Sequence, residues 1–426
     1  MLTLFGSRSI FDNYNKDILY DDTVVQEKLI PVTYSELIET SLSYLELPVH
    51  NQQFRLLSNA LYGYYNKSFN QNLSDIHALY QPLDPDNELL TLKNYTQEDY
   101  RKLQEDIFSE VDYLMEKSNY IKLELENIQE ILNRDSQYVE VSVDFDDFEK
   151  ISIYYRGNSI QKELKRNIWT LFMTTKEFEY LIYNRLFILL QPKSLEKRAK
   201  EVAEEKNIDI KKAKRKLKRR NPLLTSRETT NVYMKIFKNI PHDELRMLFP
   251  NVRVKLKSLD KIKIGVLGGG SIVAGTSSFL VKISNLMDPI SMILALGAYG
   301  AILWRQIKGI IFHRTQYLAK LAKKLYTNSL GNNECALNHI IKAAIESESK
   351  EAWLTYIFLY AMPNITTSEE LDQEIEKFFH EIYGIRIDFE ISDGLNKLIA
   401  LKIIDNPESL SILTIEETIK KYRDIF

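Results

Sequence analysis

The chain of 426 residues contains a single cysteine, Cys335, so it cannot form an intrachain disulfide bond. None of its six histidines lies within four residues of another, which excludes the helical histidine pair of zinc enzymes. The glycine–serine elbow of hydrolases and the phosphate-binding loop of nucleotide hydrolases are also absent. The sequence therefore identifies no metal ligand, no cofactor and no catalytic residue, and whether the protein is an enzyme stays open.

The composition is that of an ordinary folded protein. Apolar residues make up 44% and charged residues 27%, which excludes a chain that is disordered as a whole. The mean hydropathy is negative, so most of the mass does not lie in lipid. The first eight residues show no basic segment followed by an apolar run; we therefore expect no secretory signal and an intracellular location for most of the chain.

The net charge of −3 conceals two regions of opposite sign. Residues 83–149 contain 19 acidic and 6 basic residues, whereas residues 193–227 contain 14 basic and 5 acidic residues. Such asymmetry is typical of a surface for an anionic partner, either a membrane or a nucleic acid. The alternative is a pair of solvated surfaces that attract each other.

Hydrophobic periodicity predicts a mixed α+β chain in four parts. In residues 1–134 apolar residues, Ile121 among them, recur at helical spacing, which predicts a mainly helical region. Residues 135–260 form an α+β domain, with predicted strands at 138–143, 151–156, 231–237 and 252–256. A basic helical insertion, 193–220, lies within it. Residues 261–312 form an expected transmembrane hairpin, and 313–426 form a C-terminal helical, winged-helix-like region with a strand at 385–389.

The hairpin rests on two uncharged segments, 264–281 and 289–304. Both are slightly shorter than the roughly 20 residues of a typical span. Small residues at a spacing of four would allow close helix contact in lipid: Gly265 and Gly269, Gly270 and Ala274, Gly297 and Ala301. Twelve basic residues flank the pair and only Lys282 lies between the segments, which predicts that both termini are cytoplasmic. The alternatives are a buried core hairpin and a dinucleotide-binding turn at 261–271, whose third glycine position holds Val273.

A strongly basic segment lies in the insertion. Its members are Lys211, Lys212, Lys214, Arg215, Lys216, Lys218, Arg219 and Arg220. Small apolar residues from Ala199 to Leu217 recur every three or four positions, which predicts one helix with a basic face. Such a face binds phosphates on lipid or nucleic acid. Glu346, Glu348, Lys350 and Glu351 form another charged group, which we expect to be solvated on a helix surface.

Several segments together resemble the transmembrane-protein-143-like family. The resemblance is most specific from Met234 to Pro250, which includes Phe237, Pro241, Leu248 and Pro250. It extends to the segments 155–157 and 185–187 upstream, and to Glu348, Lys350 and Glu351 downstream. The resemblance implies a two-span membrane protein and no catalytic residue, because the family has no established activity.

These patterns together predict a membrane-anchored interaction or scaffolding protein at the cytoplasmic face of the inner membrane. The expected partners are membrane lipid, an unidentified protein and a second copy of the chain. The first alternative is a small pore built from oligomerised hairpins. A further alternative is a nucleic-acid-binding protein that uses the basic helix, although the C-terminal module offers few basic residues for it.

Overall fold

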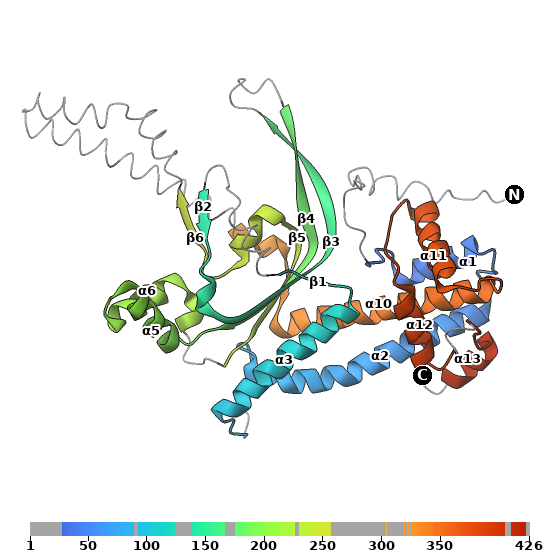
Figure 1. The fold of residues 1–426 in the computed structure, drawn as a ribbon, viewed down its shortest axis with the longest axis horizontal. Helices are drawn as coiled ribbons and strands as arrows, with labels where there is room; N and C mark the ends of the chain where they lie inside the picture. The colour runs from blue at the N-terminus through green and yellow to red at the C-terminus, as the bar shows by residue number, and fades with distance from the viewer. Residues whose placement is uncertain are drawn as a thin grey trace, which may run out of the picture.

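The computed structural model describes residues 28–88, 93–124, 139–166, 175–225, 230–256, 325–404 and 410–422, together with residues 304, 319, 322 and 323. They form a helical body, an antiparallel sheet beside it, and a pair of short helices at the end of the sheet away from that body (Figure 1). The mixed α+β class expected from the sequence is confirmed.

Helices from both ends of the chain build the helical body. They are α1 (Tyr34–Tyr44), α2 (Gln52–Tyr80), α3 (Gln97–Lys117), α10 (Asn333–Ala361), α11 (Ser368–Tyr383), α12 (Ile391–Ala400) and α13 (Ile415–Tyr422). The side chains of Thr33, Thr96 and Thr367 accept hydrogen bonds from backbone N–H groups of the first turns of α1, α3 and α11. These caps satisfy donors that a helix start would otherwise leave unpaired.

Helix α10 lies at the centre of this body. Every residue from Ser347 to Leu359 is buried, so the helix is enclosed on all sides rather than along one stripe. Its neighbours include α1, α2, α3, α11 and α12, and strand β5 (Tyr233–Pro241) of the sheet. The indole Nε1 of Trp353 donates a hydrogen bond to Oγ of Ser41 at 3.0 Å. The apolar and aromatic segment from Trp353 to Leu359 is too short to span a bilayer and is part of the core.

The main sheet is antiparallel, with its strands in the order β1-β3-β4-β5-β7. Besides β5, these are β1 (Ile121–Lys122), β3 (Phe148–Arg166), β4 (Thr175–Pro192) and β7 (Ser329–Asn332). Strands β3 and β4 form a long curved hairpin that extends beyond the rest of the sheet (Figure 1). A separate two-stranded sheet pairs β2 (Val139–Ser142) with β6 (Arg253–Leu256).

The two faces of the main sheet contribute to different cores. Tyr154, Phe187 and Ile236 pack on one face with the helical body. The opposite face packs against the short helix η5 (His242–Leu248). The family-motif residues lie on that side: Phe237 and Leu248 are buried in its core, Pro241 ends β5, and Pro250 follows η5.

The strands predicted around residues 138–143, 151–156, 231–237 and 252–256 are confirmed as β2, part of β3, β5 and β6. The apolar run at 178–190, whose pattern fits a strand or a helix, is part of strand β4. Two expectations are wrong. Ile121 belongs to strand β1 rather than to a helix, and 385–389 contains no strand beyond one bridge residue. The C-terminal helices instead pack on α2 and α10, because their apolar faces complete that core.

The basic insertion is also different from its prediction. It forms two helices, α5 (Leu195–Lys206) and α6 (Ile210–Arg220), rather than one. Asn207 adopts a left-handed conformation that ends α5, and the side chain of Asp209 caps α6. Four residues of the predicted stripe, Ala199, Ala203, Ala213 and Leu217, still share one small core, because the two helices fold against each other, whereas Lys206 and Ile210 are exposed.

The membrane interpretation has to be corrected. Among the residues that the structure describes, no helix is both long and apolar enough to cross a bilayer. The two expected spans lie outside the described residues apart from Trp304, as do the small residues from Gly265 to Ala301. The transmembrane and positive-inside assignments therefore have no support in the structure.

The close contact between α12 and α10 depends on a glycine, Gly394. A Cβ atom at Gly394 would overlap Oγ1 of buried Thr355 on α10. We expect Gly394→Ala to lower the free energy of unfolding by about 1–3 kcal/mol, as overpacking of a core does. Urea denaturation followed by circular dichroism measures this. The double variant Gly394→Ala/Thr355→Ala removes the obstructing hydroxyl. If it loses as much unfolding free energy as the two single variants lose together, the proposed clash is wrong.

Candidate functional site

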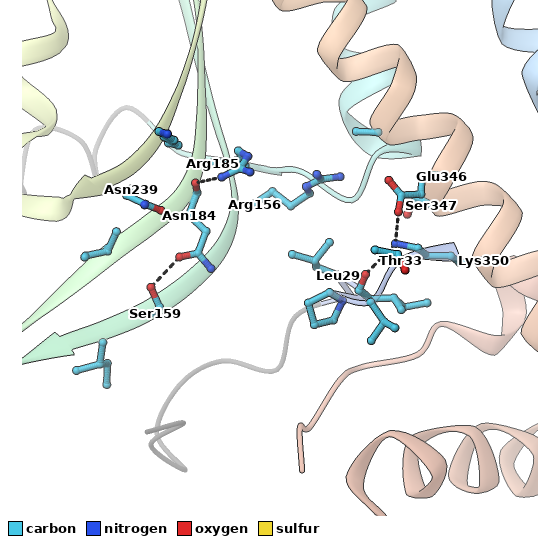
Figure 2. A pocket seen from close by; sticks show the side chains of 17 residues that line it. Leu29, Thr33, Arg156, Ser159, Asn184, Arg185, Asn239, Glu346, Ser347 and Lys350 are labelled. Atoms are coloured by element: carbon cyan, nitrogen blue, oxygen red, sulfur yellow. Dashed lines mark hydrogen bonds and ion pairs between the residues drawn. The ribbon is translucent and has the colours of Figure 1, made fainter. Parts of the chain in front are cut away.

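A polar cleft of about 780 Å³ separates the main sheet from α10. Strands β3, β4 and β5 form one wall, and α10 together with the segment 29–33 forms the other (Figure 2). Among the residues that the structure describes, four basic ones line the cleft, Arg156, Arg185, Lys238 and Lys350, against a single acidic one, Glu346. The residues that line the cleft therefore carry a net positive charge.

Three of these cations form a row across adjacent strands. Arg156 on β3 is the cross-strand partner of Arg185 on β4, and Arg185 is the partner of Lys238 on β5. Directly opposite like charges in an antiparallel pair repel each other and destabilise it. All three side chains are half-buried, so water screens their repulsion less than at an open surface. The row has a stability cost that an anion in the cleft would offset.

The sheet changes the direction of its side chains at this row. Tyr183 and Leu186 are three residues apart, yet both belong to the core on the outer face of the sheet, which is the face that packs against η5. In a regular strand, residues an odd number apart point to opposite faces. The two residues between them, Asn184 and Arg185, both line the cleft. The same occurs on β5, where Lys238 and Asn239 line the cleft between two outer-face core residues.

Unusual backbone conformations accompany this change. Gly157 on β3 has φ of +78° and Asn239 on β5 has φ of +52°, both in the left-handed region. A Cβ at Gly157 would lie 2.8 Å from Nδ2 of Asn184, so the glycine makes room for this amide. Oδ1 of Asn184 accepts a hydrogen bond from Ser159 at 2.7 Å. The local irregularity thus brings two amides and a hydroxyl to the row of cations.

The two arginines are held in place by backbone and aromatic groups. Arg156 donates to the carbonyl oxygen of Ser118 at 3.2 Å, and its guanidinium lies 5.0 Å from the ring centroid of Tyr120. Arg185 donates to the carbonyl oxygen of Asn184 at 2.9 Å. A guanidinium has five N–H donors in a planar arrangement that matches phosphate and carboxylate oxygens. These contacts orient the two guanidinium groups at the wall of the cleft.

Lys350, on the α10 side of the cleft, contacts residues of that same side. Its Nζ lies 2.9 Å from Oε1 of Glu346 and donates to the carbonyl oxygen of Ile30 at 3.1 Å (Figure 2). Burial lowers the pKa of Lys350, although Glu346 opposes that change. This lysine fixes the segment 29–33 to α10, and so it shapes the cleft from the helix side.

Behind this wall lies a buried ionic network around Lys397 of α12. Its Nζ contacts the carboxylates of Glu351 and Asp393, and it lies 3.2 Å from Glu348. Lys117 at the end of α3 lies 3.6 Å from Glu348 and 3.9 Å from Asp393. Three carboxylates thus face two ammonium groups. The expectation that Glu348, Lys350 and Glu351 are solvated is wrong, because α10 is enclosed on all sides.

The network has a link to the cleft. Ser347, which lines the cleft, donates to Oε1 of Glu351 at 3.2 Å. Nδ2 of Asn119 donates to Ser347, to Glu351 and to the carbonyl oxygen of Lys28 at 2.8, 2.7 and 3.2 Å. The network therefore fixes α3, α10, α12 and the start of the described N-terminal segment relative to one another.

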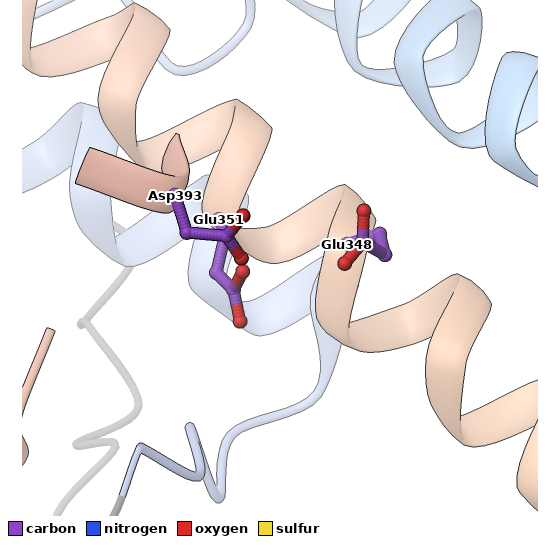
Figure 3. A group of neighbouring side chains, drawn as sticks. All are labelled: Glu348, Glu351 and Asp393. Atoms are coloured by element: carbon purple, nitrogen blue, oxygen red, sulfur yellow. The ribbon is translucent and has the colours of Figure 1, made fainter. Parts of the chain in front are cut away.

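The carboxylates of Glu348, Glu351 and Asp393 have oxygen atoms within 4.8 Å of one another, which is a spacing that could hold a metal ion (Figure 3). Here the ammonium of Lys397 contacts all three residues and supplies the positive charge. Burial would lower the pKa of Lys397, but the three carboxylates raise it above its ordinary value. The group is accordingly a structural ionic network.

Desolvation raises the pKa of Glu348 to about 7, although Lys397 and Lys117 oppose this change. Burial also disfavours ionisation of Asp393, but Lys397 and Lys117 lower its pKa overall. Glu348 is therefore the carboxylate whose pKa lies near neutral pH. Its protonation removes the excess negative charge of the network. A proton at this position is a feature that the sequence did not predict.

The predicted site residues thus have different roles. Glu348 and Glu351 belong to the network and Lys350 to the cleft wall, whereas Phe237 and Leu248 are core residues. The cations of the basic segment lie on α6, apart from the cleft. Arg156, Arg185 and Lys238 lie in the segments that carry the family resemblance, but the sequence analysis gave them no role in a site. The available signal was an arginine before a glycine inside a strand, and basic residues within otherwise apolar strands.

A family model described as "Protein of unknown function (DUF3754)" matches residues 148–335. The matched region contains the strands β3, β4 and β5, and with them all three cations of the row. Glu346 and Lys350 lie beyond its end. No solved structure matches the chain.

The raised pKa of Glu348 predicts a pH-dependent stability. Its pKa changes from about 4.5 in the unfolded chain to about 7 in the folded protein, so the folded state binds the proton more tightly. The resulting stabilisation is complete below pH 4.5 and is lost as the pH rises through 7. In Glu348→Gln this loss is absent. We expect the variant to gain on the order of 1–3 kcal/mol relative to the wild type between pH 5 and pH 8, measured by urea denaturation.

The opposite change provides the comparison. Lys397→Met leaves the buried carboxylates of Glu348 and Glu351 and the half-buried one of Asp393 around an apolar side chain, and we expect it to lose about 3–5 kcal/mol at pH 8. If Glu348→Gln differs from the wild type equally at both pH values, Glu348 does not carry the excess charge.

Proposed function

We propose that this protein binds a small anionic ligand in the cleft between the main sheet and α10. The observation that carries the proposal is the row of Arg156, Arg185 and Lys238 across three adjacent strands. Three like charges side by side lower stability, and an anion that contacts them would offset this cost. The cleft volume of about 780 Å³ lies in the range typical of small-molecule sites.

The lining indicates what kind of anion fits. Two guanidinium groups and an ammonium suit a phosphate or a carboxylate that carries more than one negative charge. The amides of Asn184 and Asn239 and the hydroxyl groups of Ser159 and Thr33 suit hydroxyl groups of a ligand. The described lining includes no aromatic side chain on which a nucleobase would stack. A phosphorylated or carboxylated polyhydroxy compound therefore fits better than a nucleotide.

An interaction or scaffolding role and the resemblance to transmembrane-protein-143-like proteins stay predictions. So does association with a second copy of the chain. The hairpin segments from which a pore would be built lie outside the described residues apart from Trp304.

The proposal predicts separate effects on stability and on binding. For the full-length protein we expect inorganic phosphate and glycerol phosphate to raise the unfolding temperature above that in chloride of equal ionic strength. The stabilisation is about 2.7 kcal/mol when the ligand concentration is 100 times Kd. In Arg185→Gln we expect this ligand effect to disappear, while the stability without ligand stays equal or increases because one repelling charge is removed.

Lys342→Gln is the control, because Lys342 is exposed on α10 and does not line the cleft. It should keep the full response to phosphate. If Arg185→Gln keeps that response as well, or if chloride and both phosphates act alike in the wild type, the cleft is not an anion site.

A further inference from the structure

The helices α5 and α6 form an arm (residues 195–220) at the end of the molecule away from α1 and α11 (Figure 1). The side of α6 that faces α5 is apolar: Ala213 and Leu217 are buried against Ala199 and Val202. This packing leaves the other side of α6 to solvent. The arm is separate from the cleft, so the inference below does not depend on the proposed ligand site.

The exposed side of α6 carries cations only. Its exposed basic residues are Lys211, Lys212, Arg215, Lys216, Lys218 and Arg219. At 100° per residue these positions fall within about half of the helix circumference, opposite Leu217. Lys214 forms an ion pair with Glu196 at 2.8 Å, but no carboxylate of the described residues is within ion-pair distance of the six exposed cations.

This arrangement is unfavourable for the helix itself. Lys211, Arg215 and Arg219 follow one another at a spacing of four, as do Lys212 and Lys216. Like charges at this spacing destabilise a helix by about 0.2–0.5 kcal/mol per pair. Helix α6 is maintained by its Asp209 cap and by its packing on α5. As in the cleft, repelling cations are kept together at a cost that an anionic partner would offset.

The arm is attached rigidly to the sheet. Arg198 of α5 is 2% exposed and lies 3.2 Å from Asp147, which is fully buried. The same guanidinium lies 3.0 Å from both Glu201 and Glu205. Asn251, which follows the phenylalanine–proline motif, donates to Asp147 at 3.0 Å. The basic face is therefore held in a fixed position before any partner binds.

We propose that the exposed face of α6 binds the phosphate backbone of double-stranded nucleic acid. From Lys211 to Arg219 the helix rises about 12 Å, so its six cations give about one charge per 2 Å. A duplex carries about one negative charge per 1.7 Å of its axis. The two linear charge densities are similar, which allows many phosphates to be contacted along one short helix.

Other anionic partners fit this face less well. An amphipathic helix enters a lipid surface through an apolar face, but Ala213 and Leu217 of α6 are already buried against α5 and only Ile210 of its apolar residues is exposed. Single-stranded nucleic acid is bound through stacking on aromatic side chains, and the arm contains none. Contacts to phosphates alone carry no base recognition, so the binding is independent of sequence.

The test uses the full-length protein and a labelled DNA duplex of about two helical turns. We expect fluorescence anisotropy to show binding whose log K falls with log salt concentration, with a slope between about −3.6 and −5.4 for four to six phosphate contacts. The quadruple variant Lys211→Gln/Lys212→Gln/Arg215→Gln/Lys218→Gln removes four of the six exposed cations, so it should bind at least about 10-fold more weakly, with a slope between about 0 and −2. Glutamine is a good helix former, and circular dichroism checks that α6 is retained.

The matched control removes the same charges from exposed positions on other helices: Arg55→Gln/Lys67→Gln/Lys342→Gln/Lys420→Gln. It should bind as the wild type does. Equal weakening in both quadruple variants would show that only net charge matters, and that result would overturn the proposal. Stronger binding to vesicles of anionic lipid, or to an acidic polypeptide, than to the duplex at equal salt would overturn it as well.

Discussion

The enclosure of α10 is the constraint on which the other features depend. Because the helix is buried all round from Ser347 to Leu359, each charged group on it must be paired inside the protein. Lys397 and Lys117 come from α12 and α3 to meet Glu348 and Glu351, and Lys350 takes the carbonyl oxygen of Ile30. These pairs fix the elements that form the helix wall of the cleft. The need to pair the buried charges of α10 thereby determines the geometry of the cleft.

Two surfaces of the molecule keep like charges together. One is the row across β3, β4 and β5, and the other is the exposed face of α6. Both are supported by well-paired neighbours: the network around Lys397 lies behind the cleft, and the carboxylates around Arg198 hold the arm. Cations that lie side by side favour the binding of an anion. The supporting ion pairs provide stability next to each of these two surfaces.

Local patterns in the sequence predicted much of the secondary structure. The alternation of β2 and β3, the two prolines around η5 and the apolar density of α10 all depend on near neighbours, and the structure has these elements. The candidate site was predicted only in part. Lys350, Glu348 and Glu351 were singled out, but the partners that give them their roles lie far along the chain, and the three strand cations were not identified.

The sequence by itself determined the α+β order, the separation of acidic and basic regions, and the presence of a basic face on the insertion, because each depends on residues a few positions apart. Only the tertiary structure decided that Arg156, Arg185 and Lys238 lie side by side, that Glu348 is buried, and that the insertion folds back on itself. These outcomes depend on strand register and on burial. Both are set by contacts between distant segments, which local periodicity does not encode.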